Sequence, residues 1–134
     1  MSLFNHLKQL NLNAQNYAIF GSGPLAIRKI IPSSNDLDIL CRRDVWDTVC
    51  QLGKCEYLEE YDVTIVNLPH HEITFGTVWG IGNFNVNMLI NTAEIIDGLP
   101  FVQLQHVVHY KKIRGSAKDL AHLQALKKSG KNFR

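Results

Sequence analysis

The sequence predicts an α+β fold, in which a small mixed β-sheet carries helices packed mainly on one face. Two observations support this fold class. Apolar residues recur at helical spacing in some segments and alternate or cluster in others, and the two kinds of segment interleave along the chain. At 134 residues, 46% of them hydrophobic, the chain is long enough for a substantial core, so a single domain over 1–134 is expected.

The first half of the chain is expected to alternate between helices and strands. The expected elements are a helix over 2–11, a strand over 17–20, a helix over 22–30, a strand over 37–41 and a helix over 44–52. Pro24 is compatible with the second helix, because a first turn needs no internal N–H bonds. Gly53 is expected to end the third helix.

The second half is expected to add strands and to close with helices. The expected elements are strands over 63–68 and 71–79, a helix over 85–92, a hairpin over 95–99 and helices over 103–113 and 116–130. Residues 85–92 also alternate like a strand, and the helix is favoured over that alternative. Asp97-Gly98 predicts the hairpin turn, and Ser116 with Asp119 predicts a capping box. The basic residues 127–134 are expected to form a frayed tail.

Composition argues against several classes of protein. The formal net charge of +2 gives no strong electrostatic steering toward nucleic acid or an anionic membrane. No apolar run reaches the roughly 18 residues of a membrane span, and the N-terminus is amphipathic rather than signal-like. We therefore expect a cytoplasmic protein without a membrane partner. The three cysteines lack a Cys-x-x-Cys pair and are expected as reduced thiols.

Two aspartates and a glycine-rich turn form the most informative pattern. Asp36 and Asp38 are two apart at a predicted strand, so their side chains share one face. Two carboxylates on an open face repel each other unless a cation lies between them, and Mg²⁺ prefers one or two carboxylates together with phosphate oxygens. The turn Gly21-Ser22-Gly23 opens a helix whose N–H groups can bind phosphate. A phosphate site beside a metal-binding pair indicates phosphoryl transfer.

This ordered set of motifs resembles the nucleotidyltransferase superfamily of DNA polymerase beta and the aminoglycoside and minimal nucleotidyltransferases. More closely, the chain resembles a group of small bacterial proteins of that superfamily, from about Tyr17 to Leu126. The resemblance is carried by the stretch 20–28, the aspartate pair, Glu72-Ile73, the stretch 96–101 and the stretch 118–120. It implies a nucleotidyltransferase-like sheet and a site that binds an NTP with Mg²⁺ or Mn²⁺.

The superfamily usually adds a third carboxylate from a neighbouring strand, and the resemblance assigns this role to Glu72. With Asp36 and Asp38, Glu72 would be a metal ligand and a catalytic residue that helps to deprotonate the attacking hydroxyl. The alternative is an exposed strand glutamate without such a role. Asn85 and Asn87 are a rival location for the third position, and amides there would leave the site without catalytic competence.

Five residues are candidates for nucleotide binding: Gly21, Ser22, Arg28, Lys111 and Lys118. Gly21 and Ser22 would contact phosphates through the turn, and Ser22 is also compatible with capping the helix. Arg28 is compatible with phosphate or with an acid of the fold. For the two lysines the resemblance implies the nucleotide side of a cleft, and the alternative is a solvated helix face.

Two classes of function follow. The first is a Mg²⁺-dependent nucleotidyltransferase that moves an NMP from an NTP to an acceptor hydroxyl of a small molecule, a protein or an RNA end. The second is a catalytically degenerate module of the same fold that binds a nucleotide or a protein partner, for example as one component of a toxin–antitoxin pair. The family has arginine where Ser116 stands and aspartate where His122 stands, and these departures weaken the transfer of C-terminal roles to this chain. Fold resemblance alone does not choose between the two classes.

Overall fold

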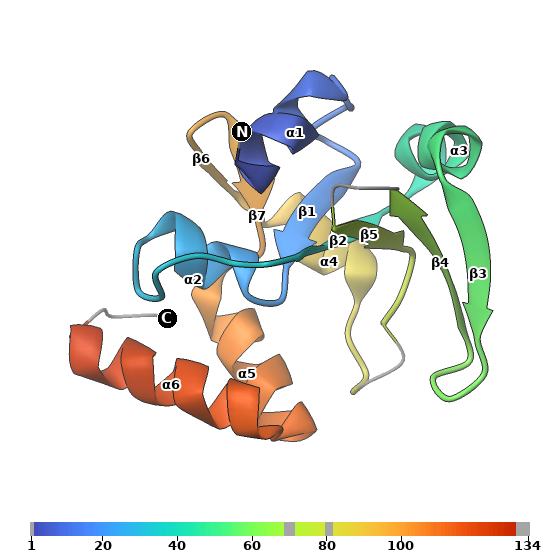
Figure 1. Ribbon diagram of the computed structural model, residues 1–134. Helices are drawn as coiled ribbons and strands as arrows, with labels where there is room; N and C mark the ends of the chain where they lie inside the picture. Colours follow the sequence, from blue (N-terminus) through green and yellow to red (C-terminus); the bar gives the residue numbers. More distant parts are fainter. Residues whose placement is uncertain (1, 69–71, 80–81, 131–134) are drawn as a thin grey trace.

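The computed structural model describes residues 2–68, 72–79 and 82–130, and its strands form one mixed sheet (Figure 1). The sheet order is β3-β4-β5-β2-β1-β7-β6. The strands are β1 (Tyr17–Phe20), β2 (Leu37–Cys41), β3 (Lys54–Leu58), β4 (Val63–Leu68), β5 (Ile73–Gly76), β6 (Glu94–Ile96) and β7 (Leu99–Phe101). The helices are α1 (Leu3–Gln9), α2 (Gly23–Ile27), α3 (Arg43–Leu52), α4 (Val86–Asn91), α5 (Leu104–Arg114) and α6 (Ala117–Ser129). The fold is therefore α+β, as the sequence predicts.

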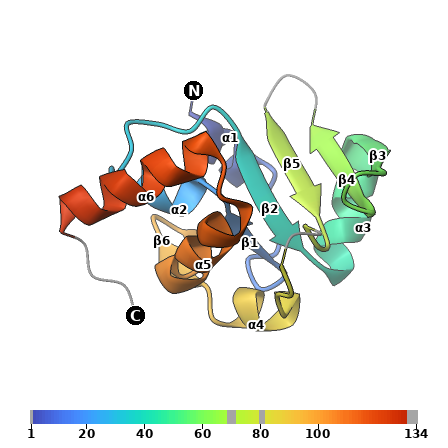
Figure 2. The ribbon, with the colours of Figure 1, turned by 90° about the horizontal axis from the view of Figure 1, so that it is seen from below.

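Helices pack on both faces of the sheet, so the prediction that they lie mainly on one face is only partly correct (Figures 1 and 2). On one face, Leu7 of α1 and Val49 of α3 join the strand residues of the core. On the other face, Leu89 of α4 and Val107 of α5 do the same, and α2 and α6 pack against α5 in a third cluster. The reason is that every residue of the central strand β1 is buried, so both of its faces need cover.

The position of β2 between β1 and β5 determines what lies beside the aspartates. β2 runs antiparallel to β1 and parallel to β5. Phe20, the last residue of β1, pairs with Asp38 on one side, and Thr74 of β5 pairs with Asp38 on the other. The Gly21-Ser22 turn that follows Phe20 therefore lies next to the Asp38 end of β2.

Most of the predicted elements are present in the structure. The strands over 17–20, 37–41 and 63–68 are confirmed, and the ambiguous segment 85–92 contains helix α4. The Asp-Gly hairpin is also confirmed, with both turn residues at positive φ, 51° at Asp97 and 78° at Gly98. These positive φ values are what a two-residue hairpin turn requires.

One strand and three boundaries differ most from the prediction. The edge strand β3 was not predicted, because almost all of its residues are exposed and give no hydrophobic alternation. α2 ends at Ile27 and is five residues long, shorter than predicted. β5 is confined to 73–76, and residues 69–71 lie outside the described residues. The predicted frayed tail begins too early, because Lys127 and Lys128 form the last turn of α6, and 131–134 lie outside the described residues.

Within the described part of the chain, no helix has both the length and the apolar character needed to cross a bilayer.

Candidate functional site

The Gly21-Ser22 turn and Asp38 fit against each other. Gly21 has φ of +62°, and a Cβ atom built on it would lie 3.0 Å from Asp38 Oδ2. A Cβ on Gly23 would lie only 2.4 Å from Cγ2 of Ile19. Glycine is thus favoured at 21 by the left-handed backbone and by the nearby Asp38 carboxylate, and it is required at 23 by the core.

Asp36 and Asp38 lie close enough to influence each other's charge. Asp36 immediately precedes β2, and its side chain is 46% exposed, whereas Asp38 within β2 is half-buried. Burial, and then the negative charge of Asp36, raise the pKa of Asp38 to about 6. The pair therefore carries negative charge that the fold does not fully compensate.

A set of positive side chains from α5 and α6 faces this pair. The charges of Arg114, Lys118 and Lys111 oppose the rise in the pKa of Asp38, in that order of strength. Lys118 Nζ lies 3.9 Å from Asp36 Oδ1, an exposed contact of small energetic weight. Carboxylates and cations thus meet where the Asp38 end of β2 approaches α6.

Asp119 forms ion pairs with two of these cations, Arg114 and Lys111. Its side chain is fully buried, and Arg114 donates to both of its oxygens, from Nη2 at 2.6 Å and from Nε at 2.7 Å. Lys111, also fully buried, lies 3.4 Å away. Burial alone would raise the pKa of Asp119, but the hydrogen bonds from Arg114 and Ser116 outweigh burial and hold that pKa well below its usual range. Asp119 is therefore ionised and fixes the positions of Arg114 and Lys111.

His122 connects Lys111 to the Gly21-Ser22 turn. Lys111 Nζ donates to His122 Nδ1 at 3.0 Å, and because an ammonium has only donors, the imidazole proton lies on Nε2. Ser22 Oγ lies 3.4 Å from the same nitrogen. Burial, and then the charge of Lys111, lower the pKa of His122, which keeps the ring neutral. Ser22 makes no side-chain cap to α2, so its hydroxyl is directed toward this cluster instead.

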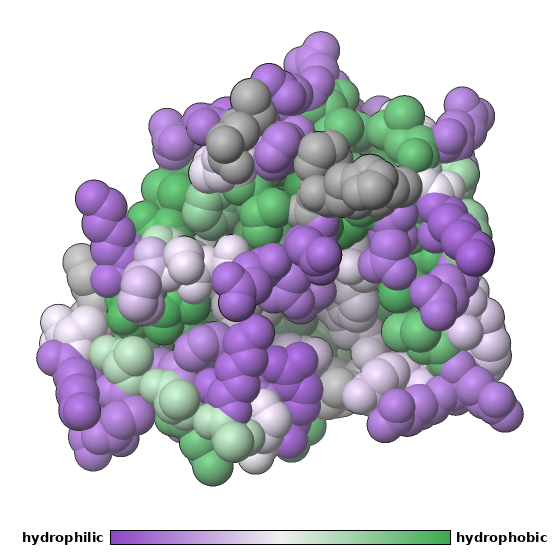
Figure 3. All heavy atoms as spheres, in the orientation of Figure 1, coloured by the Kyte–Doolittle hydropathy of each residue, from purple (hydrophilic) through white to green (hydrophobic). Residues whose placement is uncertain are grey.

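We refer to these residues together as the charged cluster: Ser22, Asp36, Asp38, Lys111, Arg114, Lys118, Asp119 and His122. Hydrophilic side chains gather across the middle of the molecular face shown in Figure 3 and along α6 below it. The negative half of the cluster, Asp36 and Asp38, suits a divalent cation. The positive half, Lys111, Arg114 and Lys118, suits an anion such as phosphate. Two carboxylates are enough for Mg²⁺, which takes its remaining ligands from water and substrate phosphates.

Glu72 lies outside the strand in which it was predicted. It precedes β5, with φ of +53°, and its backbone carbonyl accepts a hydrogen bond from Leu37 N at 2.9 Å. The β5 residue in register with Asp38 is Thr74, whose hydroxyl donates to Asn67 Oδ1 at 2.6 Å. Among the described residues, no group of three acidic, histidine or cysteine side chains is placed to hold a metal. The role of Glu72 as a third ligand stays a prediction.

Three other predicted residues have partners elsewhere in the fold. Arg28 donates to Pro24 O at 2.7 Å and pairs with Glu94 at 3.1 Å, which matches the alternative that it binds an acid of the fold. Asn85 caps α4 by accepting from Met88 N, and Asn87 accepts from Arg42. These two amides therefore have structural roles.

Arg114 and His122 were not predicted as site residues. Arg114 lies three residues after Lys111 on α5, so helical spacing places both on one side of that helix. That spacing is a signal present in the sequence. Nothing in the sequence, however, indicates that α6 folds back beyond Gly115 so that Asp119 and His122 reach Lys111.

Comparisons with known proteins give no relative: no family model matches the chain, and neither a curated protein nor a solved structure matches it.

Proposed function

We propose that the protein is a Mg²⁺-dependent nucleotidyltransferase that moves an NMP from an NTP to an acceptor hydroxyl. The observation that carries the proposal is the juxtaposition in the charged cluster. The pair Asp36 and Asp38 meets the Gly21-Ser22 turn on one side and the cations Lys111, Arg114 and Lys118 on the other. Separate negative and positive halves within one site are what a metal–triphosphate substrate needs.

The negative half fits a divalent cation. A half-buried carboxylate whose pKa is raised to about 6 by desolvation and by a second carboxylate gains a favourable partner when a cation binds. Bound Mg²⁺ or Mn²⁺ would supply charge neutralisation at the transferring phosphoryl group. In this assignment Asp36 and Asp38 hold the metal, and Asp38 stays ionised at neutral pH.

The positive half fits the phosphates. Lys118 is exposed, and Arg114 is 31% exposed, so both can reach a bound triphosphate. Lys111 is buried and does not reach the phosphates itself. It hydrogen-bonds His122 and so positions that ring, whose Nδ1 lies next to the Ser22 hydroxyl. Because α2 is short, these side chains provide more of the positive potential than the helix terminus does.

The test is transfer of label from each of the four α-labelled NTPs, with Mg²⁺, to a panel of hydroxyl acceptors and to cell lysate. Asp38→Asn is expected to lower transfer by about 10³-fold, since one electrostatic contact of a transition state has this weight. Asp47→Asn, the same change at an exposed carboxylate on α3, is expected to leave transfer unchanged. Equal transfer by the two variants would contradict the proposal.

A second candidate is a catalytically degenerate module of the same fold that binds a nucleotide or a protein partner, such as one half of a toxin–antitoxin pair. The observation in its favour is that the β5 residue in register with Asp38 is Thr74, so an acid that could act as the third carboxylate is missing at this position. Mg²⁺-dependent NTP binding without transfer to any acceptor would select this candidate. Absence of both binding and transfer would remove both candidates.

A further inference from the structure

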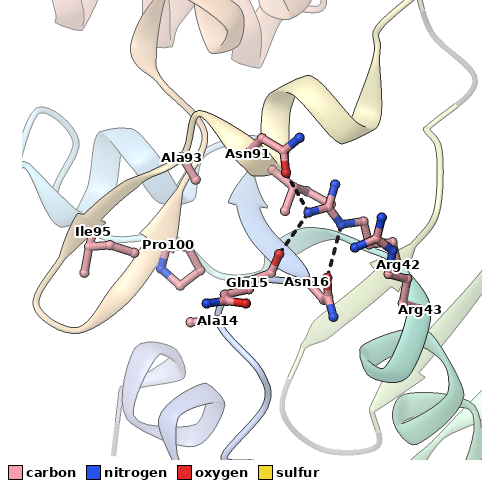
Figure 4. Close-up of a pocket in the computed structure, with 10 residues that line it drawn as sticks. Ala14, Gln15, Asn16, Arg42, Arg43, Asn91, Ala93, Ile95 and Pro100 are labelled. Atoms are coloured by element: carbon pink, nitrogen blue, oxygen red, sulfur yellow. Dashed lines mark hydrogen bonds between the residues drawn. The ribbon is translucent and has the colours of Figure 1, made fainter.

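The opposite end of β2 carries a pair of arginines instead of a pair of aspartates. Arg42 follows β2 directly, and Arg43 begins α3 with φ of +56°. They line a pocket of about 320 Å³ between the start of β1, α4 and the β6–β7 hairpin (Figure 4). Because β1 and β2 are antiparallel, this pocket and the charged cluster lie at opposite ends of the same two strands.

All five N–H groups of Arg42 are already occupied. Its acceptors are the side-chain oxygens of Asn16, Asn87 and Asn91 and the backbone oxygens of Gln15 and Asn87. Each of these acceptors is neutral. Figure 4 shows the bonds to Gln15, Asn16 and Asn91 converging on one guanidinium at the edge of the pocket.

Neither arginine has a charge partner among the described residues, whose ion pairs involve other side chains. The nearest acid to Arg42 along its hydrogen bonds is Asp44, and Asn16 stands between the two, donating its amide to Asp44. The charge of Arg43 adds to desolvation in lowering the pKa of Arg42. Two adjacent guanidiniums thus repel each other at a pocket wall without a carboxylate between them.

The rest of the pocket offers free donors and an apolar wall. The side-chain amide of Asn91 uses its oxygen for Arg42, which leaves its NH₂ group available, and no described residue hydrogen-bonds the side-chain amide of Gln15, whose own bonds use its backbone. Opposite them lie Ile95 and Pro100, on the β6 and β7 sides of the hairpin (Figure 4). Ile95 is 63% exposed, a large apolar area to leave in water.

We propose that this pocket is a binding site for a small organic anion with a compact apolar body. The anionic group binds the Arg43 guanidinium, which can donate two parallel hydrogen bonds to it, and the side-chain amides of Gln15 and Asn91 are further donors. The apolar body packs on Ile95 and Pro100. A cavity of about 150 Å³ holds a benzene ring, so this pocket has room for an anion bearing one ring. The site is separate from the charged cluster and does not depend on the function proposed for that cluster.

The test uses three probes measured by titration calorimetry on the full chain at low salt. Benzoate carries both the charge and the ring, benzamide carries the ring alone, and acetate carries the charge alone. We expect benzoate to bind at least tenfold more tightly than either of the others, and the affinity to fall as salt is added. Phenyl phosphate in parallel separates a carboxylate site from a phosphate site. Benzamide binding as tightly as benzoate, or no binding by either anion at millimolar concentration, overturns the proposal.

Two variants and one matched control locate the binding. Arg43→Gln should weaken benzoate binding at least tenfold, and Lys54→Gln, the same loss of charge at an exposed position on β3, should not weaken it. Asn91→Asp keeps the shape of the side chain but puts a carboxylate where an amide oxygen now lies 2.7 Å from Arg42 Nη2. It should raise the melting temperature and weaken benzoate binding, because it supplies the missing negative charge. Unchanged benzoate binding in Arg43→Gln, or a lower melting temperature in Asn91→Asp, contradicts the proposal.

Discussion

Each end of β2 carries a pair of like charges, and the groups that surround the two pairs differ. At the Asp38 end, carboxylates from β2 face cations from α5 and α6, and the pKa of Asp38 is still raised to about 6. At the Arg42 end, the donors of Arg42 are satisfied by neutral oxygens, and no carboxylate among the described residues pairs with either arginine. Hydrogen-bond satisfaction and charge compensation are therefore separate properties: Arg42 has the first without the second, whereas Asp38 faces opposite charges that compensate it only in part.

The largest expected difference between the two ends concerns loss of an arginine. Arg114→Met leaves Asp119 fully buried without its bidentate partner, which should lower the free energy of unfolding by about 3 kcal/mol. Arg42→Met releases only neutral acceptors near the surface, so the expected loss is about 1 kcal/mol. Urea titrations of both variants measure these losses. The same loss in both would show that buried charge does not distinguish the two ends.

The next effect is stabilisation of the Asp38 end by its proposed ligand. Mg²⁺ with an NTP at a hundred times its dissociation constant should raise the free energy of unfolding by about 2.7 kcal/mol. Asp38→Asn should abolish this increment, and Arg42→Met should keep it. Thermal melts with and without Mg²⁺ and ATP or GTP provide the measurement. An equal increment in Asp38→Asn and wild type would remove Asp38 from the metal site.

The dependence of stability on pH should identify the uncompensated carboxylate. The pKa of Asp38 is about 6 in the folded state and about 3.9 when unfolded, so between these values the folded state binds more protons. Stability therefore decreases as pH rises from about 4 to about 6, by up to about 3 kcal/mol for this group.

Asp38→Asn removes this dependence. The variant should match wild type near pH 4 and exceed its stability at pH 7, while the buried Asp119, present in both proteins, cancels in the difference. Denaturant melts of the two proteins at pH 4, 5, 6 and 7 are the check. A difference that is constant across this range would mean that Asp38 titrates normally.

The smallest expected effect is at the surface of the charged cluster. Lys118→Gln removes an exposed contact of 3.9 Å, so the free energy of unfolding should change by about 0.5 kcal/mol or less. Binding of tripolyphosphate with Mg²⁺ should weaken more than stability does, because the lysine is positioned for ligand rather than for fold. Calorimetry and melts on one variant separate the two quantities, and a large loss of stability without a loss of binding would contradict this assignment.

Local patterns in the sequence predicted most of the strands and the position of the aspartate pair. The apolar pattern predicts β2, before which the exposed Asp36 lies, and Asp97-Gly98 predicts a turn whose positive φ values the structure confirms. Features that depend on distant packing were not predictable. Arg28 has the same local signals whether it meets phosphate or Glu94, and only the hairpin's position decides between them. Glu72 has a positive φ and β5 starts one residue after it, at Ile73, and no side-chain alternation over 71–79 predicts this left-handed backbone.

The two glycines around Ser22 make the tolerance of the chain to mutation informative. A side chain at position 23 would collide with Ile19 in the core, so substitutions there should remove folded protein from a mutant library. A side chain at position 21 would meet the end of the half-buried Asp38 side chain rather than the core, so Gly21→Ala should cost roughly 1–2 kcal/mol, the cost of a left-handed alanine. In a deep mutational scan scored separately for abundance and for activity, position 23 would be depleted in both scores. Position 21 would be depleted mainly in the second, which marks it as a residue selected for what the molecule does.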